Sequence, residues 1–192
     1  MAAVPAWYPD PNEAKPAPMP LLLVQGFLNT RDPDTRIDLL GEPRAAGQWF
    51  GDAGLLDSRP SISSAEVGLA GRLRESLRAL LVSGAGEATD ATAIGPLQEL
   101  AQARRPRLAI DQSGLISLEN PQHDTLTDGL FELLLIVRAA QEDGSWTRLK
   151  ACANPDCGWV FYDRSRNQHG NWCDMAVCGN RLKNRRLRAR RR

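Results

Sequence analysis

The four cysteines of the chain form two pairs with the same internal spacing near its C-terminus. Four residues separate Cys152 from Cys157, and four separate Cys173 from Cys178. Four thiolates in two local pairs are the donor set of a tetrahedral zinc site, and a closed set of four leaves no coordination position for water or substrate. The spacing therefore predicts one structural Zn²⁺ ion with these four cysteines as its ligands.

Disulfide bonds and unrelated buried thiols are the alternatives to a zinc site. The N-terminus lacks the basic start and apolar stretch of a secretory signal, so we expect a cytoplasmic protein whose thiols stay reduced. Unrelated core cysteines are not expected to fall into pairs with equal gaps. His169 is a further candidate ligand, but the four thiols are better spaced. Zinc is the favoured interpretation.

A strongly basic segment follows the last cysteine. Eight of the twelve residues from Arg181 to Arg192 are Lys or Arg. From Arg148 onward the chain carries twelve basic and three acidic side chains, whereas the residues before it carry twelve basic and twenty acidic ones. A chain whose two parts differ this much in charge usually meets an anion at its basic end. No apolar run approaches the ~20 residues of a membrane span, so no membrane partner is expected.

This basic segment favours a nucleic-acid partner over a solvated tail. Helix formers follow Gly179, yet pairs such as Arg181 and Arg185 would place like charges one turn apart, at a cost of about 0.2–0.5 kcal/mol each. Phosphates would neutralise that repulsion and order the segment. Charge does not separate DNA from RNA; DNA is the preferred partner and RNA the alternative. The candidate nucleic-acid-binding residues are Arg164, Arg166, Arg181, Lys183, Arg185, Arg186, Arg188, Arg190, Arg191 and Arg192.

The residues between and around the cysteines indicate how the two pairs are brought together. Asn154 to Asp156 and Gly158 supply a tight backbone reversal, which allows two sulfurs to face one metal. Residues 159–162 are expected to form a strand, residues 164–170 a turn, and residues 171–172 the returning strand. A helix is expected to begin after Cys173. This order is the outline of a treble-clef finger.

Three aromatic residues of this finger, Trp159, Tyr162 and Trp172, have two possible roles. They are candidates for stacking on bases, but aromatic residues in a small finger more often form its core. The core is the preferred interpretation.

Upstream of the finger the apolar periodicity indicates a mostly helical domain. Residues 64–83 and 125–141 repeat apolar side chains every three to four positions. Shorter helices are expected over residues 43–53 and from about Pro96, and a β-hairpin over residues 107–119. Residues 21–28 are buried but do not distinguish helix from strand. Residues 1–19, with five prolines, are expected to form an extended arm.

The expected fold class is therefore α+β. A mostly α-helical domain with one β-hairpin occupies residues 20–145. A treble-clef-like zinc finger with four cysteine ligands, ending in a basic helix, occupies residues 146–192.

Two stretches of the chain resemble known families. Residues 152–192, with Cys178-Gly179-Asn180-Arg181 before a basic end, closely resemble the CGNR zinc-finger family. The upstream residues 27–31 and 38–40 are similar to the ABATE-type N-terminal domain, although residues 23–26 depart from the family's usual Leu-Asp before Phe. The resemblance implies a bacterial transcriptional regulator that binds DNA. It also implies that Cys178 is a ligand and Gly179 a small residue beside the metal, while Asn180 and Arg181 either brace the knuckle or touch phosphate.

The function expected from these features is that of a zinc-dependent DNA-binding regulator. Its helical domain would sense a ligand or mediate oligomerisation, with a homodimer and an unidentified small-molecule effector as further partners. Asn29, Thr30 and Arg31 are candidates for lining a ligand pocket, although a capped turn is the preferred interpretation. Residues 125–141 are a candidate dimer surface because they are so apolar. An enzyme is not expected, since no Ser/His/Asp set, phosphate loop or metal-carboxylate cluster is present upstream.

Overall fold

The structure, a computed structural model, describes residues 4–32, 35–58, 60–83 and 90–180. Its elements in chain order are α1 (Leu21–Asn29), α2 (Pro43–Asp52), α3 (Ser64–Ser83), α4 (Ala91–Ala103), β1 (Arg107–Ile110), β2 (Ile116–Glu119), α5 (Leu126–Glu142), the 3₁₀ turn η1 (Ser145–Arg148), β3 (Leu149–Ala151), β4 (Val160–Tyr162) and the π-helical turn η2 (Met175–Gly179). The predicted α+β class is confirmed. No helix among the described residues is long and apolar enough to cross a membrane.

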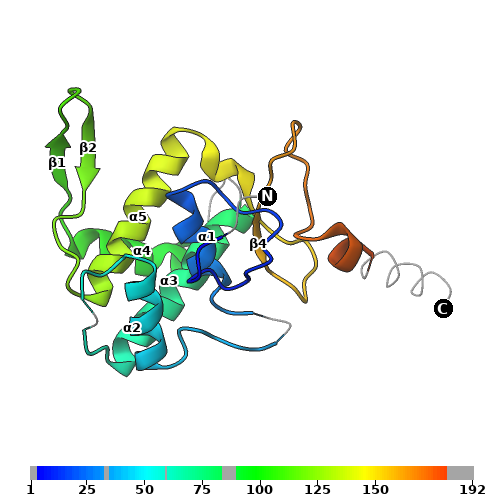
Figure 1. Ribbon diagram of the computed structural model, residues 1–192, viewed down its shortest axis with the longest axis horizontal. Coiled ribbons are helices and arrows are strands. Elements are labelled where there is room, and N and C mark those ends of the chain that lie inside the picture. The colour runs from blue at the N-terminus through cyan, green and yellow to red at the C-terminus, as the bar shows by residue number, and fades with distance from the viewer. Residues whose placement is uncertain (1–3, 33–34, 59, 84–89, 181–192) are drawn as a thin grey trace.

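Helix α1 is the centre of the helical part of the molecule. All nine of its residues are buried, and it contacts α3, α5 and β4 (Figure 1). A mostly apolar helix of this kind is stable only when other elements surround it. The run at residues 21–28, which the sequence left undecided, is a helix. The two polar side chains in it, Gln25 and Asn29, lie one turn apart on one face and are completely or almost completely buried.

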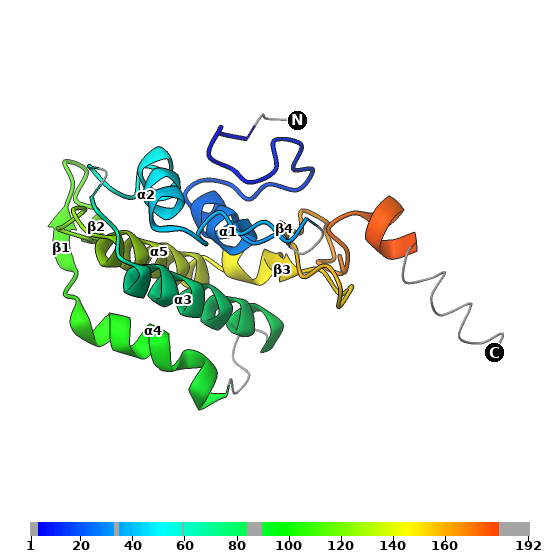
Figure 2. The ribbon, with the colours of Figure 1, turned by 90° about the horizontal axis from the view of Figure 1, so that it is seen from below.

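Helices α3 and α5 flank this centre, and α4 runs along the outer side of α3 (Figure 2). The predicted bounds of α3 are confirmed, and the residue directly before it, Ser63, caps it. The Ser63 hydroxyl accepts from the Glu66 amide, and the Glu66 carboxylate accepts from the Ser63 amide, as in a capping box.

Two further helix starts are set by capping side chains. Helix α4 begins at Ala91, earlier than the predicted start near Pro96, because Asp90 accepts a hydrogen bond from the Thr92 amide. Helix α5 begins behind a second capping box formed by Thr125 and Asp128. The predicted start of α4 was too late because Pro96 lies inside the helix, in its sixth position, and not at its beginning.

The predicted hairpin over residues 107–119 is confirmed as β1 and β2, which pair Leu108 with Leu118 and Ile110 with Ile116. These four side chains share one face, and three of them are exposed. The apolar side chains of α5, in contrast, mostly lie in the core. The apolar side chains that made residues 125–141 a candidate dimer surface therefore mostly face the core and not a partner.

The strand pairing in the finger differs from the prediction. Strand β4 was expected to pair with residues 171–172, but it pairs with β3, which precedes the first cysteine. Asn171 instead accepts one backbone hydrogen bond from the amide of Ala153. The prediction was wrong because no strand had been expected at residues 149–151, and no local pattern distinguishes the two possible partners.

The segment before α1 forms turns and lies against the finger and α1. It contains no helix or strand over residues 4–20, yet Tyr8 and Ala17 are buried. The carbonyl of Lys15 accepts a hydrogen bond from the amide of Tyr162, and the Lys15 ammonium lies 4.7 Å from the centre of the Phe161 ring. This segment therefore forms part of the surface on which the finger packs.

Candidate metal centre

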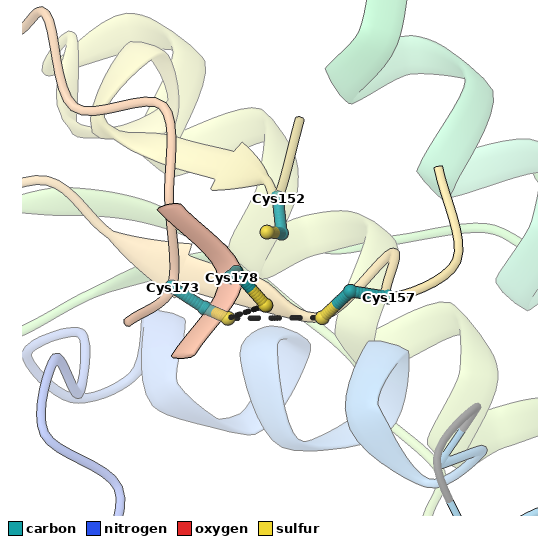
Figure 3. A group of neighbouring side chains, drawn as sticks. All are labelled: Cys152, Cys157, Cys173 and Cys178. Carbon is teal, nitrogen blue, oxygen red and sulfur yellow. Dashed lines mark hydrogen bonds between the residues drawn. The ribbon is translucent and has the colours of Figure 1, made fainter. Parts of the chain in front are cut away.

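The four cysteines converge on one point between β3, β4 and η2 (Figure 3). Their sulfur atoms all lie within 4.8 Å of one another, and three of the four residues are buried. The sulfur of Cys173 is 3.7 Å from that of Cys157 and 3.6 Å from that of Cys178. All four are free thiols, so the structure contains neither of the disulfides considered as an alternative.

The donor set and spacing of this thiol cluster fit a zinc ion. A tetrahedral ion with Zn–S bonds of about 2.3 Å requires its sulfur ligands to lie about 3.8 Å apart. The two sulfur–sulfur separations from Cys173 agree with this value within 0.2 Å. The four converging thiols therefore indicate a structural metal site.

The ionisation of the thiols shows why a cation suits this cluster. A hydrogen bond from Cys173 lowers the pKa of Cys157 to about 6. The same hydrogen bond raises the pKa of Cys173 far above its usual value, and burial raises the pKa of Cys178 to about 11. One thiolate therefore opposes the formation of the next. A bound divalent cation removes this opposition, because its charge stabilises thiolates held close together.

The loop between the first two cysteines is fixed by Asn154 and Gly158. Asn154 is almost completely buried; its carbonyl accepts from the Cys157 amide at 2.9 Å, and its side-chain amide points to Cys178 Sγ at 3.8 Å. Gly158 has a φ of 63°, a left-handed conformation that glycine adopts without strain. The tight reversal predicted for residues 154–158 therefore brings Cys157 toward the second cysteine pair.

The second pair is held by the short turn η2. Asp174 caps this turn by accepting hydrogen bonds from the amides of Ala176 and Val177, at 2.6 and 3.0 Å. A Cβ atom at Gly179 would lie 2.6 Å from the sulfur of Met175 and 3.4 Å from the Trp172 ring. A larger residue there would require the exposed Met175 side chain to move, which agrees with the small residue that the family resemblance implied.

Helix α1 docks the finger through the backbone of Val160 in β4. The Asn29 side chain accepts from the Val160 amide and donates to its carbonyl, both at 2.8 Å. Gln25 donates to the same carbonyl at 3.2 Å and accepts from the Ala17 amide at 2.6 Å. These two buried amides link the finger and the N-terminal segment to the central helix.

Helix α3 holds the same region from the other side through two arginines. Arg78 donates to the Gly158 carbonyl in the cysteine loop and, at 2.6 Å, to the Leu28 carbonyl at the end of α1. Arg74 is buried and binds the Asp38 carboxylate and, at 2.8 Å, the Thr30 hydroxyl. The side chains of Asn29 and Thr30, sequence candidates for a ligand pocket, make internal hydrogen bonds, and both residues line a cavity beside the thiol cluster. Arg31 is exposed.

A second polar cluster that the sequence did not reveal surrounds Asp163, directly after β4. Its buried carboxylate accepts from the amides of Ser165 and Gly170, at 3.0 and 2.7 Å, and from the Lys150 ammonium at 3.1 Å. Although burial opposes ionisation, these hydrogen bonds and the nearby positive charge hold the pKa of Asp163 well below its usual value. The cluster closes the loop that leads to the second cysteine pair. A single aspartate in a polar loop carries no signal of this role.

The predicted nucleic-acid-binding residues are only partly covered by the structure. Arg164 is exposed and donates to the Pro16 carbonyl at 2.8 Å, and Arg166 is exposed. The other eight candidates lie outside the described residues. They are the Lys and Arg residues of positions 181–192. His169 is exposed and is not among the side chains that converge with the thiols.

The aromatic residues of the finger are buried or partly buried in packing contacts. Trp159 and Trp172 pack against the cysteines, and Tyr162 is part of the main core. The preferred interpretation of these residues is confirmed.

Two family models match the chain. The model described as "CGNR zinc finger" matches residues 148–191, and the ABATE model, described as "Putative stress-induced transcription regulator", matches residues 23–142. The ABATE match alone covers more than half of the chain. No curated protein matches it. Both families are regulator or zinc-finger families rather than enzyme families.

Proposed function

The chain belongs to the ABATE family, and from that premise we propose that it is a zinc-dependent, DNA-binding transcription regulator of the bacterial cytoplasm. In this proposal residues 20–145 are the regulatory domain, which senses a ligand or mediates oligomerisation. Residues 146–192 are the CGNR finger and its basic arm, defined as residues 181–192. The partner that we propose is duplex DNA.

Zinc is held in this proposal by Cys152, Cys157, Cys173 and Cys178. Its role is structural: it supplies the positive charge that allows four thiolates to share one site, and with it most of the folding free energy of a small finger. The supporting contacts are those of Asn154, which points to Cys178, and of the Gly158 reversal. A closed set of four thiols offers no position for a substrate.

The observation that carries the proposal is the position of the last ligand relative to the basic arm. Cys178 lies inside η2, and Asn180, the last described residue, follows it by two positions. The Asn180 side chain donates to the Ala176 carbonyl at 3.0 Å, which continues the turn to the point where the arm begins. The metal centre therefore fixes the root of a segment whose charges repel one another. Phosphates are the natural counter-charges for such an arm.

Salt dependence of DNA binding tests this proposal. If about six of the arm's eight basic residues meet phosphates, log K falls with log salt at a slope of about −5, and affinity drops about 10³-fold between 50 and 200 mM salt. Removal of residues 182–192 should abolish most of the binding. If the truncated chain binds duplex DNA as tightly as the full chain, the arm assignment fails.

A competition between duplex DNA and structured RNA at the same salt concentration separates the two nucleic acids. The proposal expects the zinc-loaded chain to prefer DNA. A preference for RNA would replace it with the alternative of an RNA-binding protein that uses the same finger and arm.

A further inference from the structure

A cavity of about 520 Å³ lies between the metal centre, the N-terminal segment and the loop after α1. Cys157, Cys173 and Cys178 line it from the finger, residues 9–14 from the N-terminal segment, and residues 29–39 in part from α1 and its loop. Cavities of roughly 300–1,000 Å³ are typical of small-molecule sites. Because its walls come from three separate parts of the chain, a ligand in this cavity would contact both the helical domain and the finger.

The polar groups that line the cavity are strongly biased in charge. It is lined by four carboxylates, those of Asp10, Glu13, Asp32 and Asp174, and no Lys or Arg is among its described lining residues. The thiol cluster adds further negative charge, because four thiolates around one Zn²⁺ carry a net charge of −2. The potential in the cavity therefore favours a cation and disfavours an anion.

One of these carboxylates is buried and held by neutral donors. Glu13 is 6% exposed, and its Oε2 atom accepts from the Trp159 indole at 2.8 Å and the Tyr8 hydroxyl at 3.1 Å. Its Oε1 atom accepts from the Lys15 amide at 2.8 Å. No ion pair of Glu13 occurs within the described part of the chain. A buried carboxylate without a cationic neighbour is stabilised further when a cation enters beside it.

The rest of the wall is apolar. Trp159 is fixed there by its hydrogen bond to Glu13, while Ile37 and Val177 are 57% and 43% exposed. Leu39 completes this apolar side. An aromatic side chain beside carboxylates is the combination that binds organic ammonium groups through both charge and cation–π attraction.

We propose that this cavity binds a small organic cation, an ammonium group on an apolar body. The inference rests on the ligand-sensing part of the proposed function and gives it a site and a ligand class. The ammonium group lies among the carboxylates, and the apolar body lies against Trp159, Ile37 and Val177. A metal cation does not match the apolar wall, and an anionic ligand does not match the carboxylates.

A neighbouring hollow has the opposite character and makes the choice of charge testable. It is lined by Arg31, Arg36 and Arg78, together with Asp32 and Glu75, on the other side of Cys157. An anionic effector would bind in that hollow rather than in the carboxylate-lined cavity. The sign of the ligand's charge therefore decides which of the two sites binds it.

Binding in the cavity would act on DNA through η2. Asp174 and Val177 line the cavity and belong to the cap and body of η2, which ends directly before the basic arm. A bound cation offsets the carboxylates at the root of the arm, and it joins the finger to the N-terminal segment. Both effects favour a polyanion on the arm, so the ligand should raise DNA affinity.

Three probes of similar size test the ligand class on the zinc-loaded full chain: benzylammonium, benzyl alcohol and benzoate. Calorimetric titration should give benzylammonium an affinity about tenfold above that of benzyl alcohol, equivalent to about 1.4 kcal/mol. Benzoate should bind more weakly than the alcohol. Equal affinity for the alcohol, or tighter binding of benzoate, would overturn the proposal. The absence of any benzylammonium binding at about 20 mM would overturn it as well.

Conservative variants locate the bound cation. Asp10→Asn and Asp174→Asn keep an oxygen that accepts the local amide hydrogen bonds, and each should lower benzylammonium affinity about three- to fivefold. Asp111→Asn is the matched control: Asp111 also caps a turn by accepting amides, but it lies in the β1–β2 hairpin. If the control loses as much affinity as the cavity variants, or they lose none, the site is wrong.

DNA affinity without any probe, measured on the same samples, separates this inference from the proposed function. A chain that binds DNA but shows no preference for the cation refutes only the cavity assignment. A chain that binds the cation at the cavity but no DNA refutes only the proposed function.

Discussion

Replacement of Asn29 by alanine should destabilise the protein through the backbone of a residue far away in sequence. Val160 is completely buried, and the Asn29 side chain is the only hydrogen-bond partner of its amide among the described residues. Its carbonyl keeps the longer bond from Gln25. One buried amide left without a partner costs about 1–3 kcal/mol, and the lost bond to the carbonyl adds to this. We expect a loss of about 2–4 kcal/mol in the free energy of unfolding.

Urea and thermal unfolding of the zinc-loaded chain measure this loss. For a protein of this size each kcal/mol lowers Tm by about 2–4 °C, so Asn29→Ala should unfold about 4–16 °C earlier. Zinc should also be lost at a lower chelator concentration, because Val160 lies three residues after Cys157. Asn167→Ala, an exposed asparagine of the finger, is the matched control and should change stability by less than about 0.5 kcal/mol. A loss below about 0.5 kcal/mol for Asn29→Ala would refute the docking of β4 by α1.

Three further perturbations test other contacts of the finger. Asp163→Asn should cost about 2 kcal/mol of unfolding free energy at pH 7. Because the folded-state pKa of Asp163 is lowered, the stabilisation by its carboxylate is present above about pH 4 and is lost as the pH falls below it. The urea midpoints of the variant and the parent chain should therefore differ at pH 7 and converge in acid. Arg78→Met should lower the free energy of unfolding by about 1–3 kcal/mol, because the Gly158 and Leu28 carbonyls lose their hydrogen bonds. The control Arg138→Met removes an exposed ion pair and should cost less than about 0.5 kcal/mol. Equal losses for the two variants in urea unfolding would contradict the role of Arg78. Removal of zinc by a chelator should speed amide hydrogen exchange over residues 149–180 far more than over α1 and α5, and uniform exchange would show that the metal does not hold the finger separately.

Local patterns in the sequence predicted much of this fold. The bounds of α3 follow from a regular apolar stripe, and the hairpin follows from two short runs around a Ser-Gly turn. The cysteine pairs predicted convergence of four thiols because the distance between paired ligands is set locally by the loop. The short helix expected over residues 43–53 is present as α2.

The contacts that dock the finger could not be predicted in this way, because they join residues far apart in sequence. In the sequence, Asn29 is only a polar residue at the end of a short apolar run. Its role depends on the backbone of Val160 in β4, which its side chain binds. Lys15, in a proline-rich stretch without apolar periodicity, contributes a carbonyl to Tyr162 and an ammonium group to the Trp172 carbonyl. The pairing of β4 with β3 rather than with residues 171–172 is likewise decided by packing on α1 and α3.

Selection from a random pool of duplex DNA tests the central claim most directly. The zinc-loaded full chain and its Cys178→Ser variant, which keeps every basic residue of the arm, would be compared in parallel. We predict an enriched sequence with the parent chain and its loss, together with weaker binding, in the variant. Recovery of no enriched sequence by the parent, or equal enrichment by both chains, would contradict a zinc-anchored DNA-binding arm.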